Sequence, residues 1–253
     1  LIDYVVRDRK SIIKPMQPVV LDKPIELSHA LQWDQFLAPG GVMLESTAGK
    51  KDGAWQSSMG ESATPVVVAV IDTGVEANER LLSNFLYDNK QAIIGWNFSG
   101  NNSDISDETG GYHGTHVAGT IAATSADLYG MGPQLKLLPV KIPDSSGMFY
   151  ESAVINGIYW ALGEPVPGVP DNIYPAKVMN MSFGIDEGPG KEAEGCDLAI
   201  QEAVDFAHKK GAVLVVAAGN NNQENDLGAP AGCKGTIRVS STGPSGLRAY
   251  YSN

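Results

Sequence analysis

The sequence is poor in cysteine, in positive charge and in long apolar runs. Two cysteines among 253 residues exclude a disulfide-rich scaffold. A net charge of −11, from 29 acidic and 18 basic residues, argues against nucleic acid and anionic membrane surfaces as partners. No apolar run approaches the roughly 20 residues of a membrane span. We therefore expect a globular protein that binds neither nucleic acid nor membrane.

The first 30 residues carry no clear pattern and are predicted to form an extended arm. Three prolines follow the short apolar stretch of residues 2–6, where a strand is expected, and break any regular element. The chain does not begin with Met, and its first residues do not resemble the start of a signal peptide, so we expect that a segment upstream was removed. We assign residues 1–30 to an N-terminal arm and residues 31–253 to the main domain.

Apolar, β-branched segments alternate with helical patterns along the rest of the chain. Continuous runs of Val and Ile are typical of parallel strands that are buried on both faces. Strands are expected at residues 66–71, 93–98, 135–141, 177–182, 212–218 and 236–240. Helices are expected at residues 113–123, 151–162 and 197–210, and the proline-rich residues 163–175 are expected to form a loop. This order predicts an α/β fold, a doubly wound parallel sheet with helices on both faces.

Polar side chains stand where three of these strands end and where one helix begins. Asp72, Ser182 and Asn220 follow strands, and His113 opens the helix. Because the carboxyl ends of parallel strands meet at one edge of a sheet, we expect these residues to lie close together. An Asp that orients a His, a His that acts as a base and an Asn that donates to an oxyanion are the groups of acyl transfer, once a serine is added.

Two histidines three residues apart, His113 and His116, could instead indicate a zinc site. A zinc helix usually spaces its histidines by four residues with a Glu between them, and the metal needs a third ligand. The remaining histidines, His29 and His208, stand in no such pattern. We expect no metal there and interpret His116 as a structural histidine whose hydrogen bonds are satisfied.

Four stretches resemble, in order and spacing, the signature blocks of the subtilisin-like serine proteases. They are Val-Ala-Val-Ile-Asp72-Thr-Gly-Val, His113-Gly-Thr-His-Val-Ala-Gly-Thr, Val-Met-Asn-Met-Ser182-Phe-Gly and Val-Val-Ala-Ala-Gly-Asn220. The resemblance covers residues 62–253 and implies a serine endopeptidase that cleaves peptides or proteins. It implies Asp72 as the acid, His113 as the base and Asn220 as the oxyanion donor.

The same resemblance implies how a substrate is bound. It assigns substrate contacts to six positions, Ser182, Phe183, Gly184, Ala218, Gly219 and Gly228. The first three would pair with an extended peptide as an added strand, and Gly228 would form the base of the specificity pocket. Ser182 is thus assigned to substrate binding, and neither it nor Ser245 lies in a nucleophile-elbow pattern.

Spacing alone leaves Cys196 and Cys233 open between a disulfide and two free thiols. The resemblance is to secreted bacterial members with extra disulfides, and it implies that the two are bonded and that the protein is secreted or periplasmic. No cofactor is expected for the chemistry. Structural calcium at Asp104 and Asp107 is one expectation, and a solvated acidic loop is the preferred one.

The family's nucleophile lies in a Gly-Thr-Ser-Met-Ala block, which these 253 residues do not contain. We expect a companion C-terminal fragment that supplies the serine after cleavage near Asn253, with autoproteolysis as one route, and that packs against the small residues of the 113–123 helix. The alternative is a protease-fold binding or regulatory protein without catalysis. Residues 2–9 resemble the end of an inhibitory propeptide, and an ordinary arm is the equal alternative.

Overall fold

A single parallel sheet carries the candidate site. The structure, a computed structural model, describes residues 10–12, 32–36, 39–45, 53–108, 111–125, 128–185, 195–223 and 227–253. Among these, six strands form a parallel sheet in the order β3-β4-β2-β6-β7-β8. They are β2 (Val67–Asp72), β3 (Trp96–Asn97), β4 (Lys136–Lys141), β6 (Val178–Met181), β7 (Val213–Ala217) and β8 (Ile237–Val239). Each expected strand of the main domain is present, although the one expected at residues 93–98 is only two residues long.

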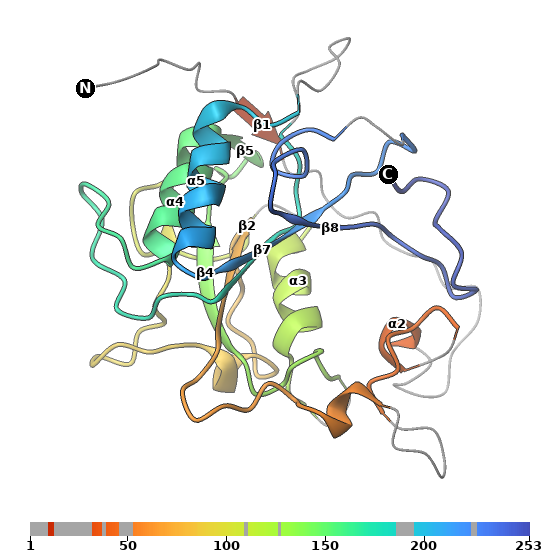
Figure 1. The fold of residues 1–253 in the computed structure, drawn as a ribbon. Coiled ribbons are helices and arrows are strands. Elements are labelled where there is room, and N and C mark those ends of the chain that lie inside the picture. Colours follow the sequence, from red (N-terminus) through yellow and green to blue (C-terminus); the bar gives the residue numbers. More distant parts are fainter. Residues whose placement is uncertain are drawn as a thin grey trace.

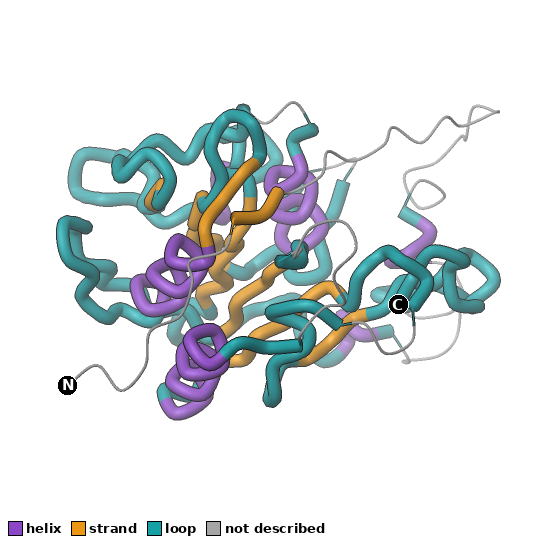
Figure 2. The backbone as a smooth tube through the Cα atoms, turned by 90° about the horizontal axis from the view of Figure 1, so that it is seen from above, coloured by secondary structure: helices purple, strands orange, loops and turns teal. Residues whose placement is uncertain are grey.

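Helices lie on both faces of this sheet, as Figure 1 and the view from above in Figure 2 show. Helices α4 (Glu151–Ala161) and α5 (Leu198–Lys209) pack side by side on one face, and α3 (His113–Ala122) packs on β2 and β4 from the other. The short elements are α2 (Trp33–Phe36), η1 (Ala54–Gln56) and η2 (Leu82–Asn84). The doubly wound α/β fold and the loop at residues 163–175 are thereby confirmed.

The apolar runs form buried strands because their alternating side chains enter two different cores. In β2, Val67, Ala69 and Ile71 pack in the core beneath α4 and α5, whereas Val70 packs with α3. All six residues of β2 are buried. Strand β2 is therefore packed on both faces, and its last residue, Asp72, lies at the carboxyl edge of the sheet. Among the described segments, none of the helices has the length and apolarity that crossing a membrane requires.

Two short strands lie outside the main sheet. β1 (Lys10–Ile12) pairs antiparallel with β5 (Met148–Tyr150). Neither was expected, because three residues are too few to show a two-residue periodicity. The strand expected at residues 2–6 lies outside the described residues, as does most of the N-terminal arm. The division at residue 30 and the choice between propeptide and ordinary arm therefore stay predictions.

Cys196 and Cys233 form a disulfide, as the resemblance implied. The bond ties the segment before α5 to the turn that leads into β8, across a sequence separation of 37 residues. Closing a loop of this length stabilises a fold by about 3–4 kcal/mol in the chain-entropy model.

Candidate active site

Asp72 and His113 are in direct contact at the carboxyl edge of the sheet. His113 Nδ1 lies 2.7 Å from Asp72 Oδ1, with the Asp72 side chain fully buried and that of His113 17% exposed. An ionised carboxylate only accepts hydrogen bonds, so Nδ1 carries the proton and Nε2 keeps its lone pair. This geometry orients His113 to act as a base through Nε2.

The charges around His113 favour its protonated form. Burial lowers the pKa of His113, but the hydrogen bond and charge of Asp72 and the charge of Asp107 outweigh burial, so this pKa lies above its ordinary value of 6.5. A base that takes a proton during a reaction becomes an imidazolium ion. The two carboxylates stabilise that ion at the moment when it forms.

Helix α3 begins without a cap from its own sequence. Tyr112, the residue before the helix, has a left-handed backbone with φ 48°, and its side chain caps nothing. Instead, Thr73 Oγ1 accepts a hydrogen bond from the Gly114 N–H at 2.8 Å, and Asp107 Oδ2 accepts one from the Thr115 N–H at 3.0 Å. The turn after Asp72 and a second loop therefore fix where His113 starts the helix.

Asp107 caps helix α3, a role that no sequence pattern predicted. Its carboxylate also accepts a hydrogen bond from Thr115 Oγ1 at 2.7 Å, and the residue is only 1% exposed. The solvated acidic loop expected here is therefore wrong for Asp107, although Asp104 is exposed and accepts hydrogen bonds from Ser106. The six-residue spacing between Asp107 and His113 is too long for a local cap, so no sequence signal marked it. Calcium at this loop stays a prediction; within the described ranges, no group of three or more potential ligands is placed to hold a metal ion.

His116 is exposed, which corrects the interpretation of a satisfied structural histidine. Helix α3 turns Gly114, Ala118 and Ala122 to the sheet, at a spacing of four residues, and His116 lies outside this stripe. His208 lies on α5, on the opposite face of the sheet, with Nε2 2.6 Å from the carbonyl oxygen of Gly235. His29 lies outside the described residues.

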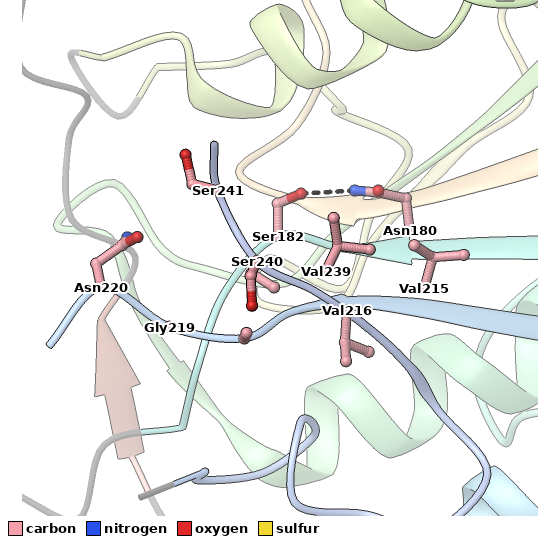
Figure 3. Close-up of a pocket in the computed structure, with 11 residues that line it drawn as sticks. Asn180, Ser182, Val215, Val216, Gly219, Asn220, Val239, Ser240 and Ser241 are labelled. Carbon is pink, nitrogen blue, oxygen red and sulfur yellow. Dashed lines mark hydrogen bonds between the residues drawn. The ribbon is translucent and has the colours of Figure 1, made fainter. Parts of the chain in front are cut away.

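Four predicted site residues line one pocket at the ends of β6 and β7 (Figure 3). The pocket has a volume of about 370 Å³, and its predicted site residues are Ser182, Ala218, Gly219 and Asn220. Val239 and Ser240 also line it, from β8 and the residue after it. Asn180 Nδ2 donates a hydrogen bond to Ser182 Oγ at 2.8 Å. The parallel register has thus brought the two strand ends together, as expected.

Phe183 and Gly228 lie outside this pocket. Phe183 is 5% exposed and packs edge-on against Phe149, with 5.2 Å between ring centroids, so only its backbone can meet a peptide. Gly228 precedes Ala229, whose carbonyl accepts a hydrogen bond from the Ile185 N–H at 2.7 Å. This bond holds the Gly228 segment beside residues 182–185. Gly184 is exposed and open to solvent.

Known proteins resemble this chain over most of its length. Residues 63–253 match the model of the subtilase family. The chain is 34% identical to the extracellular basic protease of Dichelobacter nodosus, over 91% of this chain and 40% of that relative. It is also 34% identical to subtilisin E of Bacillus subtilis (strain 168), over 78% of this chain and 46% of that relative. The chain thus spans less than half the length of these two relatives.

A solved structure agrees with this relationship. A protease from Pseudoalteromonas arctica PAMC 21717 is 33% identical and superposes with a TM-score of 0.73, over 88% of this chain and 66% of its own. The family match includes the whole parallel sheet together with Asp72, His113 and Asn220. With well over half of its residues matched to the family model, the chain belongs to the subtilase family.

Proposed function

We propose that this chain carries the acid, the base and the oxyanion donor of a serine endopeptidase. Asp72 holds His113, and His113 Nε2 takes the proton of a serine hydroxyl as that serine attacks the peptide carbonyl. The Asn220 amide then donates to the oxyanion of the tetrahedral intermediate. The observation that carries the proposal is the 2.7 Å contact between His113 Nδ1 and the buried Asp72 Oδ1.

In this proposal the serine belongs to a C-terminal segment, present as a companion fragment after cleavage near Asn253. The family's Gly-Thr-Ser-Met-Ala block is absent from the 253 residues. Support comes from the sheet face on which α3 lies, where Ile237 and Val239 of β8 are each 52% exposed. A Cβ at Gly119 of α3 would meet no atom within 4 Å. A segment that packs there would bury apolar side chains beside the pocket that holds Asn220.

The proposed substrate is an extended peptide or protein segment. Support comes from residues 182–184, which directly follow β6 and include the exposed Gly184, because an extended peptide can pair as an added strand beside such a segment. We also propose that the protein is secreted. Support comes from two relatives that are named extracellular proteases, from Dichelobacter nodosus and Xanthomonas campestris pv. campestris, and from the disulfide, which suits an oxidising compartment.

Labelling of the full-length protein with a fluorophosphonate tests the proposal. We expect one labelled serine, on a peptide outside residues 1–253, and loss of the label in His113→Ala. Native mass spectrometry should show the 26.8 kDa chain together with a second fragment. A label on a serine within residues 1–253 would contradict the companion segment. If nothing is labelled while an intact subtilase control is, the protein is instead an inactive binding or regulatory member of the family.

A further inference from the structure

The side chain of Asn253 holds the loop that contains the predicted oxyanion donor. Asn253 Oδ1 accepts hydrogen bonds from the N–H groups of Asn221 at 2.9 Å and Gln223 at 3.0 Å. The backbone N–H of Asn253 donates to the carbonyl of Gly219 at 3.1 Å. The peptide groups directly before and directly after Asn220 are therefore both bound to one residue, 33 positions further along the chain.

The backbone at Gly219 is shaped to accept this contact. Its φ is +111°, a value that side-chain-bearing residues rarely adopt, and a Cβ there would lie 2.5 Å from Asn253 Nδ2. Any other residue at position 219 would push Asn253 away. Asn220 itself is exposed and lines the pocket in Figure 3, so its amide is free to meet a ligand while its backbone is held.

Asn253 is in turn held by its own neighbours. Its carbonyl accepts hydrogen bonds from Ser240 Oγ at 2.6 Å and Ser252 Oγ at 3.0 Å. Ser252 is 1% exposed, and its hydroxyl also accepts from the Ser241 N–H at 2.8 Å. Arg248 donates to the Ser252 carbonyl at 2.7 Å. The anchor is therefore a connected polar network and not a single flexible side chain.

We propose that Asn253 is a positioning residue that fixes the backbone of Asn220 so that its amide points at the oxyanion. The inference rests on the proposed function. A hydrogen-bond donor stabilises a transition state most when it is already oriented, because no energy is then spent on reorganisation during the reaction. In this role Asn253 acts through its hydrogen bonds to the loop from Gly219 to Gln223 and not through a contact with the substrate.

A double-mutant cycle in the full-length protein tests this role. Asn253→Ala should lower kcat by between about 10-fold and about 10²-fold, since a misplacement of about 1 Å can cost about 10²-fold. KM should change little, because the ground-state substrate does not use the oxyanion donor. In the Asn220→Ala background the same substitution should leave kcat nearly unchanged, because the group that it positions is gone.

Asn172→Ala is the matched control. Asn172 is 4% exposed, and its amide donates to the carbonyls of Trp160 and Ala161 at the end of α4, far along the chain from Asn220. It should lower the melting temperature without changing kcat. If Asn253→Ala does not fold, Ser240→Ala removes the hydroxyl that donates to the Asn253 carbonyl and should show a smaller kcat loss with the same dependence on Asn220.

Two results would overturn the inference. If the losses from Asn253→Ala and Asn220→Ala multiply in the double variant, or if Asn253→Ala has wild-type kcat, Asn253 does not act through Asn220. In both cases the wild-type enzyme is active and the proposed function stands. A wild-type full-length protein that hydrolyses no peptide overturns the proposed function and this inference together.

Discussion

The row of side chains that crosses the sheet from β2 to β8 passes from a closed core to an open surface. Val70 pairs in register with Asn180, Asn180 with Val215, and Val215 with Ile237. Neighbours in register share a face, which here is the face of α3. Val70 is 1% exposed beneath α3, whereas Ile237 is 52% exposed. The side of the site that holds His113 (the base side) therefore lies on a buried core, whereas on the side that holds Asn220 (the oxyanion side) strand β8 is exposed.

The two sides also orient their functional groups by different means. His113 is held by the buried carboxylate of Asp72 and by helix α3, whose small residues pack closely against the sheet. Asn220 is fixed by polar contacts near the surface, from Asn253 to the backbone on either side. Burial gives the first arrangement stability without further partners, whereas the second depends on how well a surface loop is held.

The largest expected effect is on the base side. His113→Ala in the full-length protein should lower kcat by about 10⁶-fold, a loss of the size already known for the triad histidine of subtilisins, because the proton acceptor is removed. Single-turnover hydrolysis of a peptide substrate measures it. His116→Ala, an exposed histidine on the same helix, is the matched control and should keep kcat near wild type. Equal losses in the two variants would refute the assignment of His113 as the base.

The next effect is on the oxyanion side. Asn220→Ala should lower kcat by about 10²- to 10³-fold, again a size already known for this donor in subtilisins, with KM little changed. Its melting temperature should stay near wild type, because Asn220 is exposed. Steady-state kinetics together with calorimetry separate the two effects. A rise in KM at constant kcat would mean that Asn220 binds the substrate and does not stabilise the transition state.

Valine truncations test whether the open face is covered in the full-length protein. Val70→Ala should cost about 2 kcal/mol of unfolding free energy, because it removes buried methyl groups. Val239→Ala should cost about 1–2 kcal/mol if the proposed C-terminal segment covers β8.

Val42 is the matched control for Val239. Val42 is 56% exposed and lies near α2, away from the sheet, so Val42→Ala should cost less than about 0.5 kcal/mol. Denaturant unfolding monitored by fluorescence gives all three values. If Val239→Ala lowers the unfolding free energy as little as Val42→Ala does, β8 is uncovered, which would argue against a C-terminal segment packed on this strand.

The smallest effect concerns the pH dependence of the base. The charge of Asp107 helps to raise the pKa of His113, so Asp107→Asn should lower that pKa. His113 must be neutral to accept a proton, and the acid limb of kcat/KM should therefore move to lower pH. Asp104→Asn, in the same loop but exposed, is the control and should leave the limb in place. An unchanged limb in Asp107→Asn would mean that this carboxylate only caps α3.

The same titration affects stability. Because the pKa of His113 is raised in the folded state, the protonated histidine stabilises the fold at pH values below its unfolded pKa. That contribution is lost as pH rises through the raised folded value. Unfolding free energy measured across this range should therefore fall with pH more steeply in the wild type than in His113→Ala.

Local sequence patterns predicted most of the sheet and singled out Asp72 and His113, which lie in contact at its edge. The continuous apolar runs of β2 and β7 predicted strands, and the polar residue after each marked its end. The helical spacing of the apolar residues Val117, Ala118, Ile121 and Ala122 was enough to predict α3. These predictions succeeded because each depends on a few consecutive residues and on how a strand or helix distributes its side chains.

Contacts between distant segments escaped sequence reasoning. Nothing local marks Asp107 as the cap of α3, or predicts that Asn253 binds the loop around Asn220. The runs at 212–218 and 236–240 were both expected as strands, yet β8 is exposed along its length. A run of residues specifies which faces are apolar, but whether something covers a face depends on segments elsewhere.

By itself the sequence determined the strands of the main sheet, its three long helices and the order of the candidate site residues, since periodicity and strand ends are local properties of the chain. It also carried the motifs that identify the family. Only the tertiary structure decided that His113 Nδ1 contacts Asp72 Oδ1, that Asp107 is buried and that Asn253 accepts a hydrogen bond from the loop around Asn220. Each of these is a contact between segments that the fold brings together, and its geometry depends on the packing of the sheet and helices between them.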